Sequence, residues 1–138
     1  MNKMLKRILL IVVGIIILVN LIPVDRTNPP VKNELKMPAN VKAIIKKACY
    51  DCHSNETIWP LYSYVAPASW LVSGDVTNGR KHLNFSEWNT DDQNEALDEI
   101  WEEIEKNEMP LKIYTFIHSD AVLSKEEKTV IKNWIDNN

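Results

Sequence analysis

Two cysteines and a histidine lie in one short segment of the chain, Cys49-Tyr-Asp-Cys52-His53. Two thiols about one helical turn apart can each add across a vinyl group of haem. The adjacent imidazole is then placed to bind the iron from one face. The segment therefore predicts one haem c, attached covalently through Cys49 and Cys52, with His53 as the proximal iron ligand.

Other uses of this motif stay open from the sequence. A thiol–disulfide site of the thioredoxin type is expected within a βαβ unit, and no such pattern surrounds the two cysteines. A zinc site would need two more ligands, for which His82 and His118 are present, but zinc ribbons pair two cysteine knuckles. A chance occurrence of the motif is the third alternative. The chain has only 2 cysteines, which excludes a disulfide-stapled scaffold.

A second iron ligand is expected if the haem transfers electrons, and Met or His side chains are the usual candidates. Met109 directly precedes Pro110, which we expect to end an acidic helix and to leave the thioether in a loop. Met37, His82 and His118 are the alternatives, and an open sixth position is another. We predict Met109 as the sixth ligand.

Large flat side chains and a cation are candidates for the surroundings of the haem. Trp59 and Trp70 are predicted to pack against it, although ordinary core packing is the alternative for both. Arg80 is predicted to pair with a haem propionate, because a buried anion needs a partner. Its alternative is a plain surface charge.

Helical periodicity accounts for the body of the chain. Apolar residues recur at helical spacing in residues 38–48, 90–107 and 124–138, and a shorter helix is expected over residues 67–78. No segment alternates with a period of two for long enough to form a strand. The sequence predicts an all-α bundle of short helices around one haem.

Capping residues sharpen the expected helix ends. Thr90 with Gln93 and Ser124 with Glu127 have the spacing of capping boxes. Gly79 is expected to end the shorter helix in the left-handed conformation.

The first residues of the chain differ from the rest. A long apolar run over residues 8–22 follows Lys3, Lys6 and Arg7, and no small-residue cleavage site follows it. We expect an uncleaved signal-anchor, a single transmembrane helix over residues 1–24. Because cations stay on the cytoplasmic side, the body is expected on the periplasmic, extracytoplasmic side of the cytoplasmic membrane.

Domain division follows from this expectation. Residues 25–34, polar and with a Pro-Pro step, are predicted to be a linker, and residues 35–138 a cytochrome c-like haem-binding domain.

Charge limits the choice of partner. The chain has 16 Lys and Arg against 19 Asp and Glu, and three of the basic residues precede the apolar run, which leaves 13 for the body. An acidic body excludes nucleic acid as the expected partner. The acidic residues within 91–108 either form a solvated helix face or steer a basic redox protein.

The chain resembles two groups of known proteins. A helix before CxxCH, a Met-Pro loop and a last helix with Ser-x-x-Glu at its start resemble class I c-type cytochromes. More narrowly, the chain is similar to the bacterial haem-binding domain family from about Leu35 to Ile135. The segments that carry this resemblance are Cys49-Tyr-Asp-Cys-His-Ser-Asn-Glu-Thr-Ile-Trp59-Pro60, Tyr62-Ser63, Val65-Ala66-Pro67, Ser69-Trp70, Asp75-Val76, Gly79-Arg80 and Leu83-Asn84-Phe85-Ser86 with Trp88.

The resemblance implies covalent haem and a redox role, with no indication of the partner. Class I cytochromes often have a Gly-Pro after the ligand histidine, whose carbonyl accepts a hydrogen bond from that imidazole. Ala66-Pro67 is the nearest equivalent here, so Pro67 either helps to fix His53 or only starts a helix.

We therefore expect a membrane-anchored mono-haem cytochrome that carries single electrons and is not an enzyme. The alternative is a haem-based gas or redox sensor, or a peroxidase-like domain, with an open or labile sixth iron site.

Overall fold

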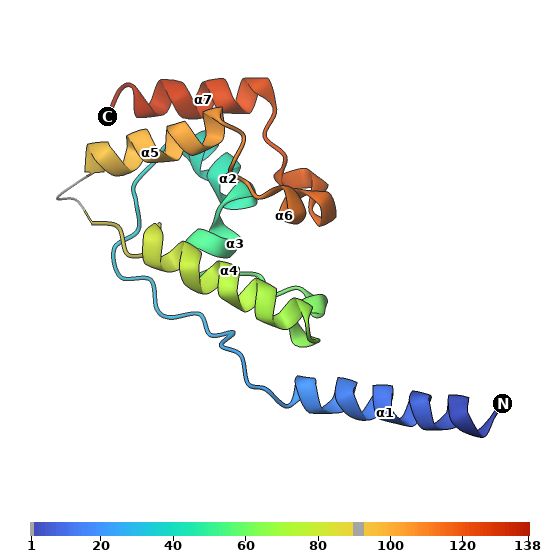
Figure 1. Ribbon diagram of the computed structural model, residues 1–138. Coiled ribbons are helices and arrows are strands. Elements are labelled where there is room, and N and C mark those ends of the chain that lie inside the picture. The colour runs from blue at the N-terminus through green and yellow to red at the C-terminus, as the bar shows by residue number, and fades with distance from the viewer. Residues whose placement is uncertain (1, 90–92) are drawn as a thin grey trace.

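The computed structural model describes residues 2–89 and 93–138, and the regular structure of these residues is helical (Figure 1). The α-helices are α1 (Lys3–Asn20), α2 (Ala39–Ala48), α3 (Tyr50–His53), α4 (Ala68–His82), α5 (Gln93–Glu105), α6 (Lys112–Ile117) and α7 (Lys125–Ile135). Two 3-10 turns, η1 (Leu61–Tyr64) and η2 (Ser119–Ala121), lie before α4 and α7.

The helices form a body from which α1 projects (Figure 1). α5 packs against α7, and α2 contacts α7 and η2. α3 packs on α4, which in turn contacts η1. The short helix α3 therefore connects the α2–α5–α7 half of the body to the half that contains α4.

One cluster of apolar side chains holds these elements together. Its members come from α2, α3, α5, α7 and the segments that precede α2, α5 and α7. The buried ones are Leu35, Val41, Ile45, Ala48, Tyr50, Phe85, Trp88, Leu97, Ile100, Ile104, Leu123, Ile131, Trp134 and Ile135. The periodic residues of α2, α5 and α7 supply most of this core, because one face of each helix is apolar.

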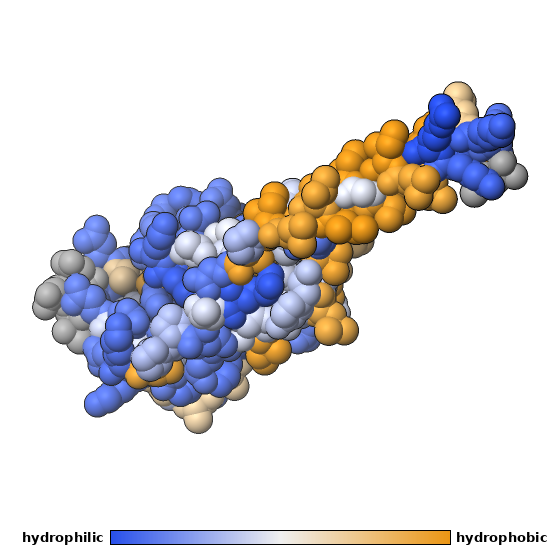
Figure 2. Space-filling view, turned by 90° about the horizontal axis from the view of Figure 1, so that it is seen from below, coloured by the Kyte–Doolittle hydropathy of each residue, from blue (hydrophilic) through white to orange (hydrophobic). Residues whose placement is uncertain are grey.

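The expected transmembrane helix over residues 1–24 is not supported by the structure. α1 is apolar along most of its length and projects from the body (Figure 2), but it has 18 residues and includes Lys3, Lys6 and Arg7. The uncharged part rises only ~18 Å, against a hydrocarbon core of ~30 Å. Within residues 2–89 and 93–138, no helix combines the length and the apolar character that crossing a membrane requires. The same finding contradicts the prediction of a single-pass membrane anchor.

The segment predicted as a linker is held against the body. The backbone N–H groups of Lys32 and Asn33 donate to the Ser86 carbonyl, at 3.0 and 3.1 Å, and Leu35 N–H donates to the Phe85 carbonyl at 2.9 Å. Residues 32–35 therefore have fixed backbone partners.

Helix ends were predicted with mixed success. In α7 the Ser124 hydroxyl accepts from Glu127 N–H at 3.1 Å, and the Glu127 carboxylate accepts from Ser124 N–H at 2.9 Å. This capping box confirms the prediction. The other proposed box involves Thr90, which lies outside the described residues. The helix expected to stop before Gly79 continues to His82, and Gly79 is not in the left-handed conformation.

Candidate functional site

The CxxCH segment begins where α2 ends. Cys49 N–H donates to the Ile45 carbonyl at 2.8 Å, and the Cys49 carbonyl then accepts from Cys52 N–H at 3.2 Å and from His53 N–H at 2.9 Å. The two cysteines are thus one helical turn apart. This is the spacing that two thioether bonds to one haem require.

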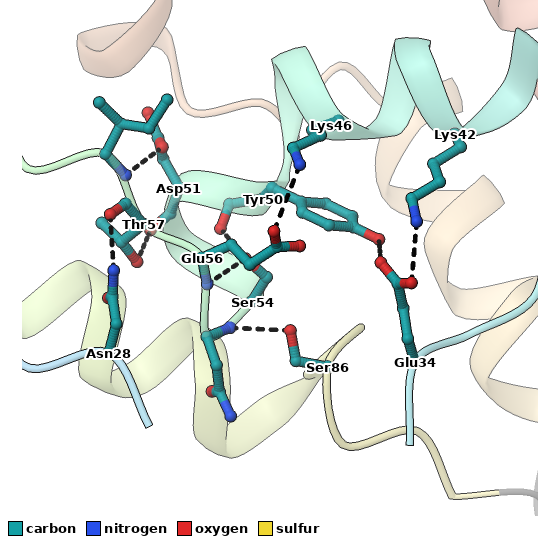
Figure 3. A network of polar contacts seen from close by, with 12 residues as sticks. Asn28, Glu34, Lys42, Lys46, Tyr50, Asp51, Ser54, Glu56, Thr57 and Ser86 are labelled. Carbon is teal, nitrogen blue, oxygen red and sulfur yellow. Dashed lines mark hydrogen bonds and ion pairs between the residues drawn. The ribbon is translucent and has the colours of Figure 1, made fainter. Parts of the chain in front are cut away.

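Tyr50 anchors this turn in the core. Its side chain is 1% exposed, and its ring is stacked on Phe85 with centroids 5.4 Å apart. Its hydroxyl donates to the Glu34 carboxylate at 3.0 Å, and Lys42 binds the other oxygen of that carboxylate at 2.8 Å (Figure 3). The residue between the cysteines therefore fixes how α3 is oriented.

The loop that follows CxxCH is held by hydrogen bonds to the same turn (Figure 3). The Ser54 hydroxyl donates to the Tyr50 carbonyl at 2.8 Å and accepts from Glu56 N–H at 2.9 Å. The Thr57 hydroxyl donates to the Asp51 carbonyl at 2.8 Å. Because these polar groups are paired within the loop, the CxxCH backbone has little freedom to move.

His53 has one of its two ring nitrogens occupied. Its Nδ1 lies 3.1 Å from the Leu83 carbonyl oxygen, and a carbonyl can only accept, so Nδ1 carries the proton. Burial lowers the pKa of His53 below its ordinary value, which favours the neutral ring. The unprotonated Nε2 is then the atom available to a metal. The hydrogen-bond partner of His53 is therefore the Leu83 carbonyl, and Pro67 stands directly before α4, so its role beside His53 stays a prediction.

Gly79 brings α4 against the CxxCH turn. A Cβ on this residue would stand 2.6 Å from the carbonyl oxygen of Cys52, which is closer than real Cβ atoms come. The absence of a side chain therefore allows α4 to approach α3. The close approach of α4 also places the Leu83 carbonyl within hydrogen-bonding distance of His53.

The pKa values of both thiols are raised well above the ordinary value for cysteine. Burial raises the pKa of Cys49 to about 12 and that of Cys52 to about 12, and nearby carboxylates contribute to the shift at Cys52. Thiol–disulfide exchange needs a thiolate, and its sites have lowered pKa values. The raised pKa values of both thiols disfavour a redox dithiol site.

Three adjoining cavities surround the CxxCH turn. The first, of about 200 Å³, and the second, of about 270 Å³, share Cys49, His53 and Met109 in their linings. The third, of about 230 Å³, shares Cys52 and Tyr114 with the second. The run of cavities has room for a large flat group beside both cysteines and the histidine.

Met109 reaches the cavities because α5 ends early. Asn107 takes the left-handed conformation, with φ 57°, which terminates the helix before Pro110 is reached. The chain folds back, so that Met109 N–H donates to the Glu103 carbonyl at 3.2 Å. The Lys128 ammonium, which lies in α7, donates to the Asn107 side chain at 2.7 Å and so links the end of α5 to α7. The helix end expected at Pro110 is thus made by Asn107.

Other candidate iron ligands lie elsewhere or have partners. Met37 packs against the core cluster and lines none of the three cavities. His118 Nε2 lies 2.7 Å from the Tyr62 hydroxyl, away from the first two cavities. His82 lines both of those cavities, and its Nε2 lies 2.7 Å from the Glu99 carboxylate.

Three residues predicted to surround the haem are not found in the linings of the three cavities. Trp70 is 38% exposed, and Trp59 donates to the Asn28 side chain at 3.3 Å. Arg80 donates to the carbonyls of Ser54 and Thr27, at 2.7 and 2.8 Å. It also donates to the side chains of Asn28 and Thr57. This guanidinium holds the N-terminal segment to the loop after CxxCH. Roles for these three residues, and for Pro67, beside a bound haem stay predictions.

Zinc receives no support from the arrangement of ligands. In the described part of the chain, no three His, Cys, Asp or Glu side chains form a group that could hold a metal ion. His82 and His118, which a zinc site would need, each lie at hydrogen-bonding distance from another side chain.

A family comparison decides between the remaining interpretations. Residues 14–137 match the family whose description is the haem-binding domain. The chain belongs to this family of haem-binding domains. No curated protein and no solved structure shows significant similarity to it.

The residues of this haem-binding domain fit the group that the family binds. A neutral imidazole with a free Nε2, a thioether and two protonated thiols line one stretch of cavity, and each is a group that haem can use.

Sequence reasoning missed the residues that support the site. Leu83 acts through a backbone carbonyl, which any residue type supplies. Gly79 was predicted to end a helix, whereas its lack of a side chain allows the close approach to Cys52. Tyr50 and Asp51 occupy the variable positions of the motif. Their burial and hydrogen bonds depend on Glu34 and on segments distant in the sequence.

Proposed function

We propose that this haem-binding domain is a mono-haem c-type cytochrome that carries single electrons and is not an enzyme. The observation that supports this best is the lining of the second cavity, which contains Cys49, Cys52, His53 and Met109 together. These residues offer two thiols that could attach haem and two side chains that could bind its iron. When bound, haem supplies an iron that changes its oxidation state by one electron.

The two cysteines would hold the haem covalently. Each thiol would add across one vinyl double bond of haem, with the sulfur bonding to one carbon and the thiol hydrogen passing to the other. The addition needs no oxidant or reductant. Cys49 and Cys52 lie at the two ends of one turn, which suits attachment at two neighbouring positions.

His53 and Met109 would bind the iron. The Leu83 carbonyl holds His53 in the tautomer whose Nε2 can bind a metal. Met109 offers a soft, neutral sulfur that favours the reduced ion and excludes small molecules from the sixth position. Both side chains line the first and second cavities, and both ligand segments have fixed backbones.

A basic redox protein is the partner that the charge distribution favours. Glu99 and Glu103 of α5 line the first cavity, and further acidic residues stand along the same helix. An acidic face beside the haem cavity would attract a cationic partner over a distance set by ionic strength.

Absorption spectra of the oxidised and reduced protein test this function, using protein made in a host that attaches haem c. The expected result is the spectrum of a low-spin haem c with two axial ligands, unchanged when carbon monoxide is added. Ready binding of carbon monoxide would favour the sensor or peroxidase-like alternative. A colourless protein with a Cys49–Cys52 disulfide would refute haem attachment altogether.

A further inference from the structure

Asp51, inside the CxxCH motif, has a carboxylate that is bound on both oxygens. One oxygen accepts from the Tyr114 hydroxyl at 2.8 Å, and the other accepts from Ile58 N–H at 2.9 Å. Burial and the neighbouring Asp51 raise the pKa of Tyr114, so its hydroxyl stays protonated and remains a donor. A hydrogen bond to an ionised group is stronger than one between neutral groups.

Tyr114 connects this carboxylate to the segment that carries Met109. It lies in α6, which begins directly after Leu111, and Thr115 N–H donates to the Leu111 carbonyl at 3.0 Å. Upstream, Met109 N–H is bound to Glu103. The Met109 segment thus runs between two fixed points, the end of α5 and the start of α6.

α6 itself has few other attachments. None of its residues is buried, and Ile113, Phe116 and Ile117 are 55%, 88% and 56% exposed. The Tyr114 ring is stacked on His118 with centroids 4.5 Å apart, and His118 Nε2 lies 2.7 Å from the Tyr62 hydroxyl. The bond to Asp51 is a direct hydrogen bond between α6 and the CxxCH turn.

We propose that Tyr114 is a positioning residue for the sixth iron ligand. Its hydroxyl binds Asp51 and so holds the segment of Met109 to Leu111 against the turn that carries Cys49, Cys52 and His53. Met109, Leu111 and Tyr114 all line the second cavity together with residues of that turn. This inference rests on the proposed function, in which Met109 binds the iron.

Tyr114→Phe isolates the hydroxyl from the rest of the side chain. The phenyl ring keeps the stack on His118 and its place in the linings of the second and third cavities. Only the bond to Asp51 is lost. Tyr62→Phe is the matched control, because it removes a hydroxyl that contacts His118 and leaves the Asp51–Tyr114 bond intact.

Carbon monoxide binding to the reduced haem protein, and the sulfur-to-iron charge-transfer band of the oxidised protein, measure how firmly Met109 is held. Tyr114→Phe should strengthen carbon monoxide binding roughly 10- to 100-fold, as expected for the loss of one hydrogen bond to a charged group. It should also weaken the band, and Tyr62→Phe should do neither. An effect of Tyr62→Phe equal to that of Tyr114→Phe would overturn the inference.

A second variant, Asp51→Asn, tests the same hydrogen bond in case Tyr114→Phe does not fold. Asp51→Asn removes the charge and leaves one acceptor oxygen for two donors, the Tyr114 hydroxyl and Ile58 N–H, so an effect in the same direction is expected. If Tyr114 acts through Asp51, the double variant should bind carbon monoxide no more strongly than the more affected single variant. Fully additive effects would overturn the inference.

The proposed function is tested separately by Met109→Ala. If that variant loses the charge-transfer band while Tyr114→Phe behaves like the unmutated protein, the inference fails and the function stands. If Met109→Ala leaves the band unchanged, Met109 is not the ligand, and the ligand assignment and the inference both fail.

Discussion

Gly79 of α4 lies against the carbonyl oxygen of Cys52 so closely that a Cβ on Gly79 would be 2.6 Å from that atom. The contact joins the longest helix of the body to the turn that carries both cysteines and the histidine. The distance between α4 and α3 depends on it. Because Leu83 directly follows this helix, the contact also affects the hydrogen bond that orients His53.

Gly79→Ala should destabilise the protein by about 1–3 kcal/mol, the usual cost of forcing an extra methyl group into a packed site. The atom it meets is backbone, which cannot swing aside. Gly74→Ala, in the same helix, is the matched control, since a Cβ there has no neighbour within 4 Å. It should be neutral or stabilising by about 0.5–1 kcal/mol. Thermal unfolding of the haem-loaded proteins measures both, and equal stability of the two variants would contradict the packing argument.

The lowered pKa of Glu34 predicts that the folded protein loses stability in acid. Its hydrogen bond from Lys42, and then that from Tyr50, lower its pKa below the ordinary value of 4.5. The ionised form is therefore favoured in the folded state, so the stabilisation is complete above pH 4.5 and is lost as the pH falls through the lowered pKa.

The destabilisation caused by Glu34→Gln should accordingly be largest near neutral pH and disappear in acid. Free energies of unfolding at a series of pH values measure it. Glu95→Gln is the control, because Glu95 is an exposed residue of α5 with no ion pair in the described part of the chain. A penalty for Glu34→Gln that does not change between about pH 7 and pH 3 would show that the carboxylate contributes no charge-dependent stability.

Helices with a long apolar stripe were predictable from the sequence. α2 and α7 lie within one to three residues of their expected ends, since periodic burial and a capping box act locally. α6 was not predicted. It has six residues and no buried side chain, and the bond from Tyr114 to Asp51 reaches across 63 positions in the sequence.

The candidate site was predictable where residue types carry its chemistry. Cys49, Cys52 and His53 form a motif whose spacing has a chemical reason, and Met109 precedes a proline in a loop. The backbone carbonyl of Leu83 gives no such signal, because any residue type supplies one. The prediction that Trp70 lies beside the haem rests only on size and aromaticity, and it stays a prediction.

Covalent attachment predicts that haem stays with the unfolded chain. The unmutated protein should keep its haem through acid-acetone extraction and denaturing electrophoresis, because thioether bonds do not depend on folding. The double variant Cys49→Ser, Cys52→Ser should lose all of it under the same conditions. Serine has nearly the same size as cysteine but does not add to a vinyl group. Haem released from the unmutated protein would rule out c-type attachment.

If Met109 binds the iron, it should affect the reduction potential and the access of small molecules to the iron. A thioether is a soft, neutral ligand, so relative to a histidine it raises the reduction potential and keeps small molecules from the sixth position. Met109→Ala should abolish the sulfur-to-iron charge-transfer band of the oxidised protein, lower the potential and open the reduced haem to carbon monoxide. Absorption spectroscopy and a redox titration measure these effects.

Met37→Ala is the control for this experiment, because Met37 packs against the core cluster and lines none of the three cavities around the CxxCH turn. It should leave the spectrum, the potential and carbon monoxide binding unchanged. If Met109→Ala also leaves the spectrum unchanged, the sixth ligand is another residue. His82 would then be tested first, since it lines the first and second cavities, whereas His118 lies at hydrogen-bonding distance from Tyr62 and lines neither.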